Sequence, residues 1–93
     1  MLDREEAERR AAEFLAEQSR TWGPSSNVRI IPEYCFTDRG RFIAPYDHVD
    51  YLDHGRDDMQ LGGNLPVAVD MSTGSCSFIT REEAEDMMAR DLL

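Results

Sequence analysis

The alternation of apolar and polar positions predicts a β-hairpin over residues 65–79. Apolar residues recur with a period of two on either side of a polar segment, which places them on one face of two strands: Leu65, Val67, Val69, Cys76 and Phe78. The segment between them, residues 70–74, has turn chemistry. Asp70 can bond nearby backbone groups and Gly74 tolerates a positive φ. The pattern therefore predicts two antiparallel strands joined by a tight turn.

Helical periodicity marks both ends of the chain. Residues 3–19 carry an apolar stripe at intervals of three and four, with Asp3 as the N-cap and Glu6 completing a capping box. A second capping box, Thr80 to Glu83, begins a helix near the end of the chain. Its apolar stripe is Ala84, Met87, Met88 and Leu92, and we interpret both methionines as core residues. A helix is therefore expected on each side of the strands.

Two further strands are predicted, over residues 28–37 and 41–46, with a turn at residues 38–40. Both segments are rich in β-branched and aromatic residues. Pro32 and Pro45 interrupt them, and proline cannot donate to a strand ladder. Each proline therefore predicts an edge strand or a bulge.

The order of these elements predicts an α+β fold. We expect a small antiparallel sheet of three to four strands, with an N-terminal helix and a C-terminal helix packed on one face. The 93 residues have room for one modest core, so residues 1–93 are expected to form a single domain. A binding surface is easier to build on such a domain than a buried catalytic cleft.

The charge balance restricts the class of partner. Nineteen acidic residues oppose ten basic ones, for a net charge of −9, which repels nucleic acids and anionic membranes and favours a basic protein surface. The first twenty residues are too charged for a signal peptide, and no apolar run has membrane-spanning length. A cytoplasmic location is therefore expected, with Cys35 and Cys76 reduced.

Residues 47–58 hold both histidines and five aspartates. His48 and His54 are spaced for neither a helical zinc pair nor a tight strand pair, and the aspartates lack the order of a calcium loop. We therefore predict no metal and no cofactor. Two interpretations remain open for this segment: a solvated acidic loop anchored by Tyr51 and Leu52, or an acidic patch that faces a basic partner.

Several spaced motifs resemble one bacterial family. They are Phe42, then Tyr51-Leu52-Asp53-His54-Gly55, Gly63-Asn64-Leu65-Pro66 and Asp70-Met71-Ser72-Thr73-Gly74. With the two terminal helices, they make nearly the whole chain similar to the YrhB-type immunity proteins, also called the immunity protein 35 family, which are found beside polymorphic toxins. The resemblance implies a binding protein without a catalytic centre. Some members are predicted to neutralise papain-like peptidase toxins, and others have an uncertain, chaperone-like role.

Three functional hypotheses follow. The first is an immunity protein that binds and neutralises a basic toxin or enzyme through Tyr46, Asp47, Asp50, Tyr51, Asp53, Asp57 and Asp58. The second is an accessory or chaperone-like protein that holds a peptide or a client enzyme by adding a strand near Pro32 or Pro45.

The third hypothesis is an enzyme with His48 or His54 as general base. It is disfavoured because no nucleophile lies near either histidine in the sequence, so no catalytic residue is assigned. The oligomeric state stays open: an exposed edge strand would support a dimer, and the prolines would prevent one.

Overall fold

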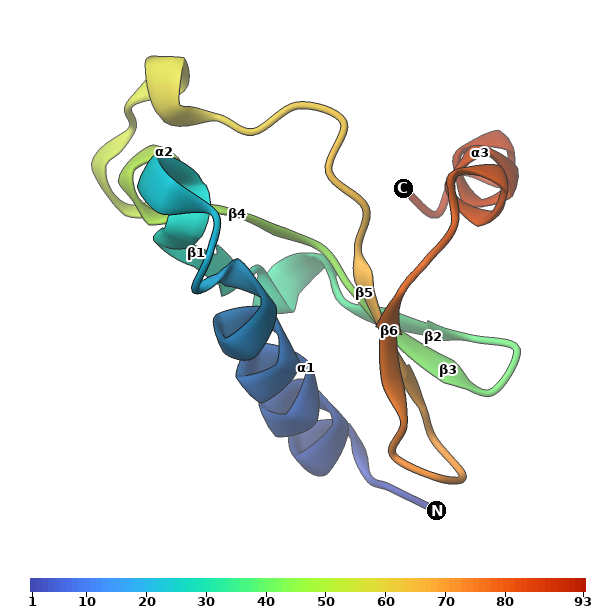
Figure 1. Cartoon of the computed structure of the whole chain (residues 1–93). Coiled ribbons are helices and arrows are strands. Elements are labelled where there is room, and N and C mark those ends of the chain that lie inside the picture. The colour runs from blue at the N-terminus through green and yellow to red at the C-terminus, as the bar shows by residue number, and fades with distance from the viewer.

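Three α-helices and two small antiparallel sheets make up the fold (Figure 1). The computed structural model describes residues 1–93, except for the side chain of Ser25. The helices and strands are α1 (Arg4–Ser19), β1 (Val28–Ile30), β2 (Phe36–Asp38), β3 (Arg41–Ala44), β4 (Tyr46–His48), α2 (Val49–His54), β5 (Val67–Asp70), β6 (Cys76–Phe78) and α3 (Arg81–Ala89). Three short 3-10 helices are η1 (Gly23–Ser26), η2 (Pro32–Tyr34) and η3 (Asp57–Met59). The predicted α+β class is confirmed.

The larger sheet has four antiparallel strands in the order β2-β3-β5-β6. The predicted hairpin forms its β5–β6 half, where Val67 pairs with Phe78 and Val69 with Cys76. Its turn forms as predicted, because Asp70 Oδ1 accepts from the backbone N–H groups of Ser72 and Thr73 at 2.8 and 3.1 Å. The smaller sheet pairs β1 with β4.

Pro32 and Pro45 mark the point at which the chain changes sheets. The predicted strand over residues 28–37 divides into β1 and β2, with η2 beginning at Pro32. On the return, Pro45 separates β3 from β4, and its carbonyl accepts from Ile31 N at 2.9 Å. The edge-strand alternative is confirmed for residues 28–37, since β1 and β2 each lie at a sheet edge, whereas β3 lies inside the larger sheet. At both prolines the chain changes sheets instead of forming a bulge, since a residue without an N–H ends each ladder.

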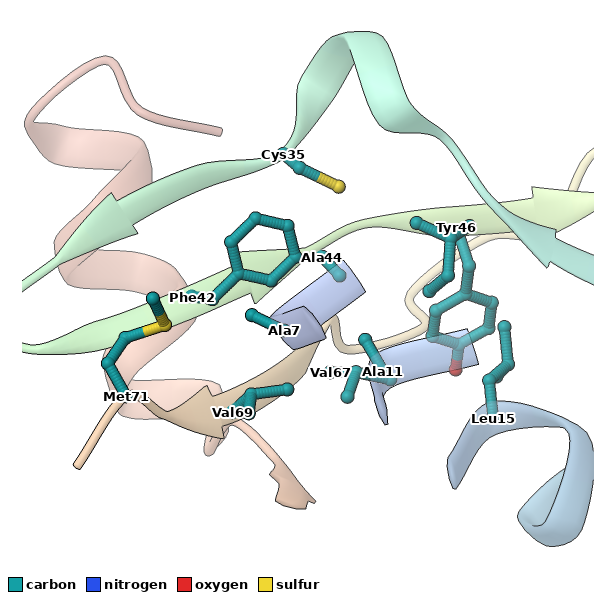
Figure 2. Close-up of a cluster of buried hydrophobic side chains, with 11 residues drawn as sticks. Ala7, Ala11, Leu15, Cys35, Phe42, Ala44, Tyr46, Val67, Val69 and Met71 are labelled. Atoms are coloured by element: carbon teal, nitrogen blue, oxygen red, sulfur yellow. The ribbon is translucent and has the colours of Figure 1, made fainter. Parts of the chain in front are cut away.

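The two terminal helices lie on opposite faces of the larger sheet (Figure 1). Phe42, Ala44, Val67 and Val69 face α1, where they pack with Ala7, Ala11 and Leu15 (Figure 2). Ile43, Ala68 and Ile79 pack instead with Ala84 and Met87 of α3. The expectation of both helices on one face was therefore wrong, because β3 and β5 are apolar at successive positions and need cover on both sides.

The helix caps form largely as predicted. Asp3 Oδ1 accepts from Glu6 N at 2.8 Å, although the Glu6 carboxylate binds Arg9 and Arg10 instead of completing a capping box. The Thr80–Glu83 capping box of α3 is complete. Within the described residues, no helix combines the length and apolar character that crossing a bilayer requires.

Candidate functional site

The acidic segment contains a short helix, α2, where the sequence suggested a loop. His48 caps its start, since its Nδ1 accepts from Asp50 N at 3.1 Å. Gly55 ends it with φ +66° and donates its N–H to the carbonyls of Asp50 and Tyr51. A polar N-cap and a left-handed glycine are ordinary helix boundaries, so the local sequence accounts for this helix.

His48 has a structural role. It is 3% exposed, and its Nε2 lies 3.2 Å from the carbonyl oxygen of Pro24. Because Nδ1 accepts a hydrogen bond, the ring proton sits on Nε2 and is donated to Pro24. Both ring nitrogens are therefore engaged, which leaves neither free to take a proton from a substrate. His54, by contrast, is exposed at the end of α2.

No metal centre is formed by the part of the chain that the structure describes. Groups of three or more His, Cys, Asp or Glu side chains arranged to hold an ion are absent from it. Both cysteines are free thiols, and burial raises the pKa of Cys35 to about 11 and also raises that of Cys76. A protonated thiol is a poor nucleophile, so these cysteines are suited to packing.

Two of the predicted contact residues are buried. Tyr46 is 6% exposed and packs against Trp22 and Phe78, with ring centroids 6.1 Å apart in each pair, and burial raises the pKa of its phenol. Asp47 is 8% exposed, and its Oδ1 accepts from His48 N at 2.7 Å and Leu61 N at 2.8 Å. These side chains hold the fold together and are not accessible to a partner.

The other four aspartates lie at the surface in two kinds of environment. Asp53 and Asp58 are paired within the chain, Asp53 with Arg29 at 2.6 Å and Asp58 with Arg56 at 3.0 Å. The bond from Arg29 holds the pKa of Asp53 below its usual range. Asp50 and Asp57 have no ion-pair partner among the described side chains. Their charges are the ones available to a partner.

Tyr51 lines an open groove between α2 and η2. The groove has a volume of about 560 Å³, and its lining residues are Ile31, Glu33, Tyr34, Asp47, Tyr51, Leu52, Gly55 and Gln60. We call it the tyrosine groove. Tyr34 is 65% exposed, so a large aromatic side chain stands free at its edge. The groove thus brings together Tyr51, which was predicted as a contact residue, and Tyr34, which lies seventeen positions earlier in the sequence.

Tyr34 was missed because the sequence placed it in a strand. Pro32 is the available signal, since proline is favoured at the first position of a helical turn. The turn is held from α1: Arg4 Nη2 donates to the carbonyls of Pro32 and Cys35, each at 3.3 Å. The Arg4 guanidinium also lies 5.7 Å from the centroid of Phe42. The wall that carries Tyr34 is therefore fixed to the N-terminal helix.

Comparison with known proteins gives no family for this chain: no family model, no curated protein and no solved structure matches it. The functional argument therefore depends on the tyrosine groove and on the charges around it.

Proposed function

We propose that this protein binds a basic surface of another protein through the tyrosine groove. The observation that carries the proposal is the placement of Tyr34 and Tyr51 on one open groove that the exposed Glu33 also lines. No arginine lines this groove among the described residues. An amphipathic aromatic surface with only negative charge suits the arginine and lysine side chains of a partner.

The charge of the whole molecule supports the same partner. A net charge of −9 attracts a basic protein over a distance of several ångströms and accelerates its encounter. Asp50 and Asp57 add local negative charge on the segment that forms one wall of the groove. Aromatic anchors such as Tyr34 and Tyr51 typically contribute most to slow dissociation. Charge and aromatic contact thus have separate roles in this proposal.

In this proposal, the protein neutralises a basic toxin or enzyme in the cytoplasm by binding it. The resemblance of the chain to YrhB-type immunity proteins supports it, and a papain-like peptidase is one candidate partner. An inhibitor of this kind needs no catalytic residue. It acts by covering the partner's surface, so buried area and charge complementarity determine its strength.

The test is affinity capture from the native cytosol at low and high salt, followed by mass spectrometry. We expect one stoichiometric protein that is released by salt, and we expect Tyr34→Ala and Tyr51→Ala to abolish its capture. Glu17→Gln is the matched control, because Glu17 is an exposed acid on α1 that pairs with Arg20. Salt-insensitive capture, or equal capture by both tyrosine variants, would contradict the proposal.

An accessory or chaperone-like function is the second candidate. It is favoured by the position of β2 at the edge of the four-stranded sheet, directly after η2. A peptide could add to this edge as a further strand. Such binding follows the sheet edge, so Asp57→Ala would leave it unchanged, whereas the same variant would weaken capture of a basic partner.

A further inference from the structure

We propose that the same partner inserts an apolar side chain into a second groove, which adjoins the tyrosine groove at Tyr34. This inference rests on the proposed function and names the surface that the partner must present. That surface carries an exposed leucine-like or aromatic side chain within a few residues of an arginine or lysine. The second groove, which we call the apolar groove, has a volume of about 540 Å³.

Four of the five exposed large apolar side chains among the described residues line this groove or the one beside it. Among the described residues, the large hydrophobic side chains that are exposed are Met1, Tyr34, Met88, Leu92 and Leu93. Tyr34, Leu92 and Leu93 line the apolar groove. Met88 and Leu93 line a smaller groove of about 320 Å³ that shares Pro45 with it. A contiguous exposed apolar surface on a small protein commonly marks an interaction site.

Met88 was expected in the core, and the structure corrects that interpretation. Met87 is 1% exposed and packs against Ile43 and Ile79, but Met88 is 54% exposed on the neighbouring face of α3. The backbone then turns at Asp91, with φ +63°, and Leu92 N donates to Met87 O at 2.8 Å. The helix ends at this turn, and Leu92 and Leu93, which follow it, line the apolar groove together with Tyr34.

The charges that line the apolar groove favour a basic partner over a second copy of the chain. Glu33 and Asp91 both line it. In a two-fold dimer the same patch would meet itself, so the contact would bring together the Glu33 and Asp91 carboxylates of both copies. A net charge of −9 on each copy adds further repulsion. A partner with an apolar side chain beside a positive charge satisfies both features of the groove.

The apolar groove and the tyrosine groove are continuous. Glu33 and Tyr34 line both the apolar groove and the tyrosine groove. Tyr34 and Glu33 therefore belong to both grooves, which form one continuous surface. A single segment of a partner can place an apolar side chain in the apolar groove and a guanidinium or ammonium group in the tyrosine groove.

The experiment uses the full chain and a short synthetic peptide that alternates leucine and arginine. Titration of the isotopically labelled protein, followed by amide NMR shifts, locates the peptide. We expect shifts at Tyr34, Phe36, Leu92 and Leu93, and about a tenfold or greater loss of affinity for Leu93→Ser, as is typical of an anchor contact. Leu93→Met is the matched control and retains affinity. A peptide with serine in place of leucine should bind about tenfold more weakly.

Several results would overturn this inference. Equal affinity for the leucine and serine peptides would do so, as would shifts confined to α2. A concentration-dependent dimer that is lost in Leu93→Ser would assign the groove to a second copy. The partner captured from cytosol could bind the Leu93→Ser variant as tightly as the unaltered protein and yet fail to bind the Tyr51→Ala variant. In that case the apolar insertion is wrong and the proposed function stands. If the unaltered protein captures no partner in a salt-sensitive way, the proposed function itself is wrong.

Discussion

Arg29 on β1 donates two hydrogen bonds to Asp53 on α2, from Nη2 at 2.6 Å and from Nε at 3.2 Å. The pair connects the smaller sheet to the helix that carries much of the acidic segment. It also neutralises one of the charges that the sequence assigned to partner recognition. Asp57 has no such ion pair within the described residues, so these two aspartates differ in the charge that they present.

Asp57→Asn should therefore slow association with a basic partner more than Asp53→Asn does. The reason is that long-range attraction depends on net local charge, and Arg29 already cancels that of Asp53. Arg29→Gln should accelerate association, because it removes the ion pair that neutralises the charge of Asp53. Stopped-flow association rates with the leucine and arginine peptide at low salt measure all three effects. An equal or larger loss for Asp53→Asn would show that the ion pair opens on binding.

Local chemistry accounts for the elements that the sequence predicted well. Asp70 can form its turn, and Thr80 can form a capping box with Glu83, through contacts within three residues along the chain. The hairpin and the terminal helices follow from such contacts together with apolar periodicity. They are therefore visible in the sequence without knowledge of the tertiary structure.

The candidate site was harder to predict because distant contacts decide it. Asp47 and His48 are both buried, and each forms a hydrogen bond to a residue far away in the sequence. Asp47 bonds to Leu61, fourteen residues away, and His48 to Pro24, twenty-four residues away. Nothing in the spacing of these polar residues distinguishes them from the exposed aspartates that follow. Tyr34 presents the opposite case, since an aromatic residue in an apparent strand is exposed by the turn that Pro32 begins.

His48→Ala should destabilise the fold by about 1–3 kcal/mol, the usual cost of losing a helix cap and leaving buried polar groups unpaired. The variant removes the acceptor of Asp50 N and the donor to Pro24 O. His48→Asn should recover part of the loss, because asparagine can still cap α2. Urea unfolding measures the free energies. His54→Ala is the control, expected within about 0.5 kcal/mol of the unaltered protein because its side chain is exposed.

Gly74→Ala should cost more stability than Gly40→Ala. Both glycines have φ +80°, so each alanine incurs a backbone penalty of about 1 kcal/mol or more. At Gly74 alone, an added Cβ would also lie 2.5 Å from Nη1 of Arg10, so this flexible side chain must shift and disturb its bond to Glu6, at a small further cost; at Gly40 the space is open. Thermal and urea unfolding give the comparison. Adding Arg10→Ala should bring Gly74→Ala close to the Gly40→Ala value, and failure to do so would locate the extra cost elsewhere.

Acidification should weaken the polar contacts that connect α3 to the sheet. Arg90 binds both oxygens of Asp38, at 2.9 and 3.0 Å, and lowers the pKa of that carboxyl from its ordinary 3.8. Thr80 N–H and then Arg41 lower the pKa of Glu83 from 4.5. Both carboxyl groups have a lower pKa in the folded protein than in the unfolded chain, so the unfolded chain binds these protons more readily. The stabilisation is therefore complete at pH values above the unfolded-state pKa and is lost as the pH falls through the folded-state pKa. The free energy of unfolding, measured by urea titration across this range, should therefore fall with pH. The double variant Asp38→Asn, Glu83→Gln should be less stable at neutral pH and show a shallower fall. An unchanged slope would mean that other carboxyl groups control the acid response.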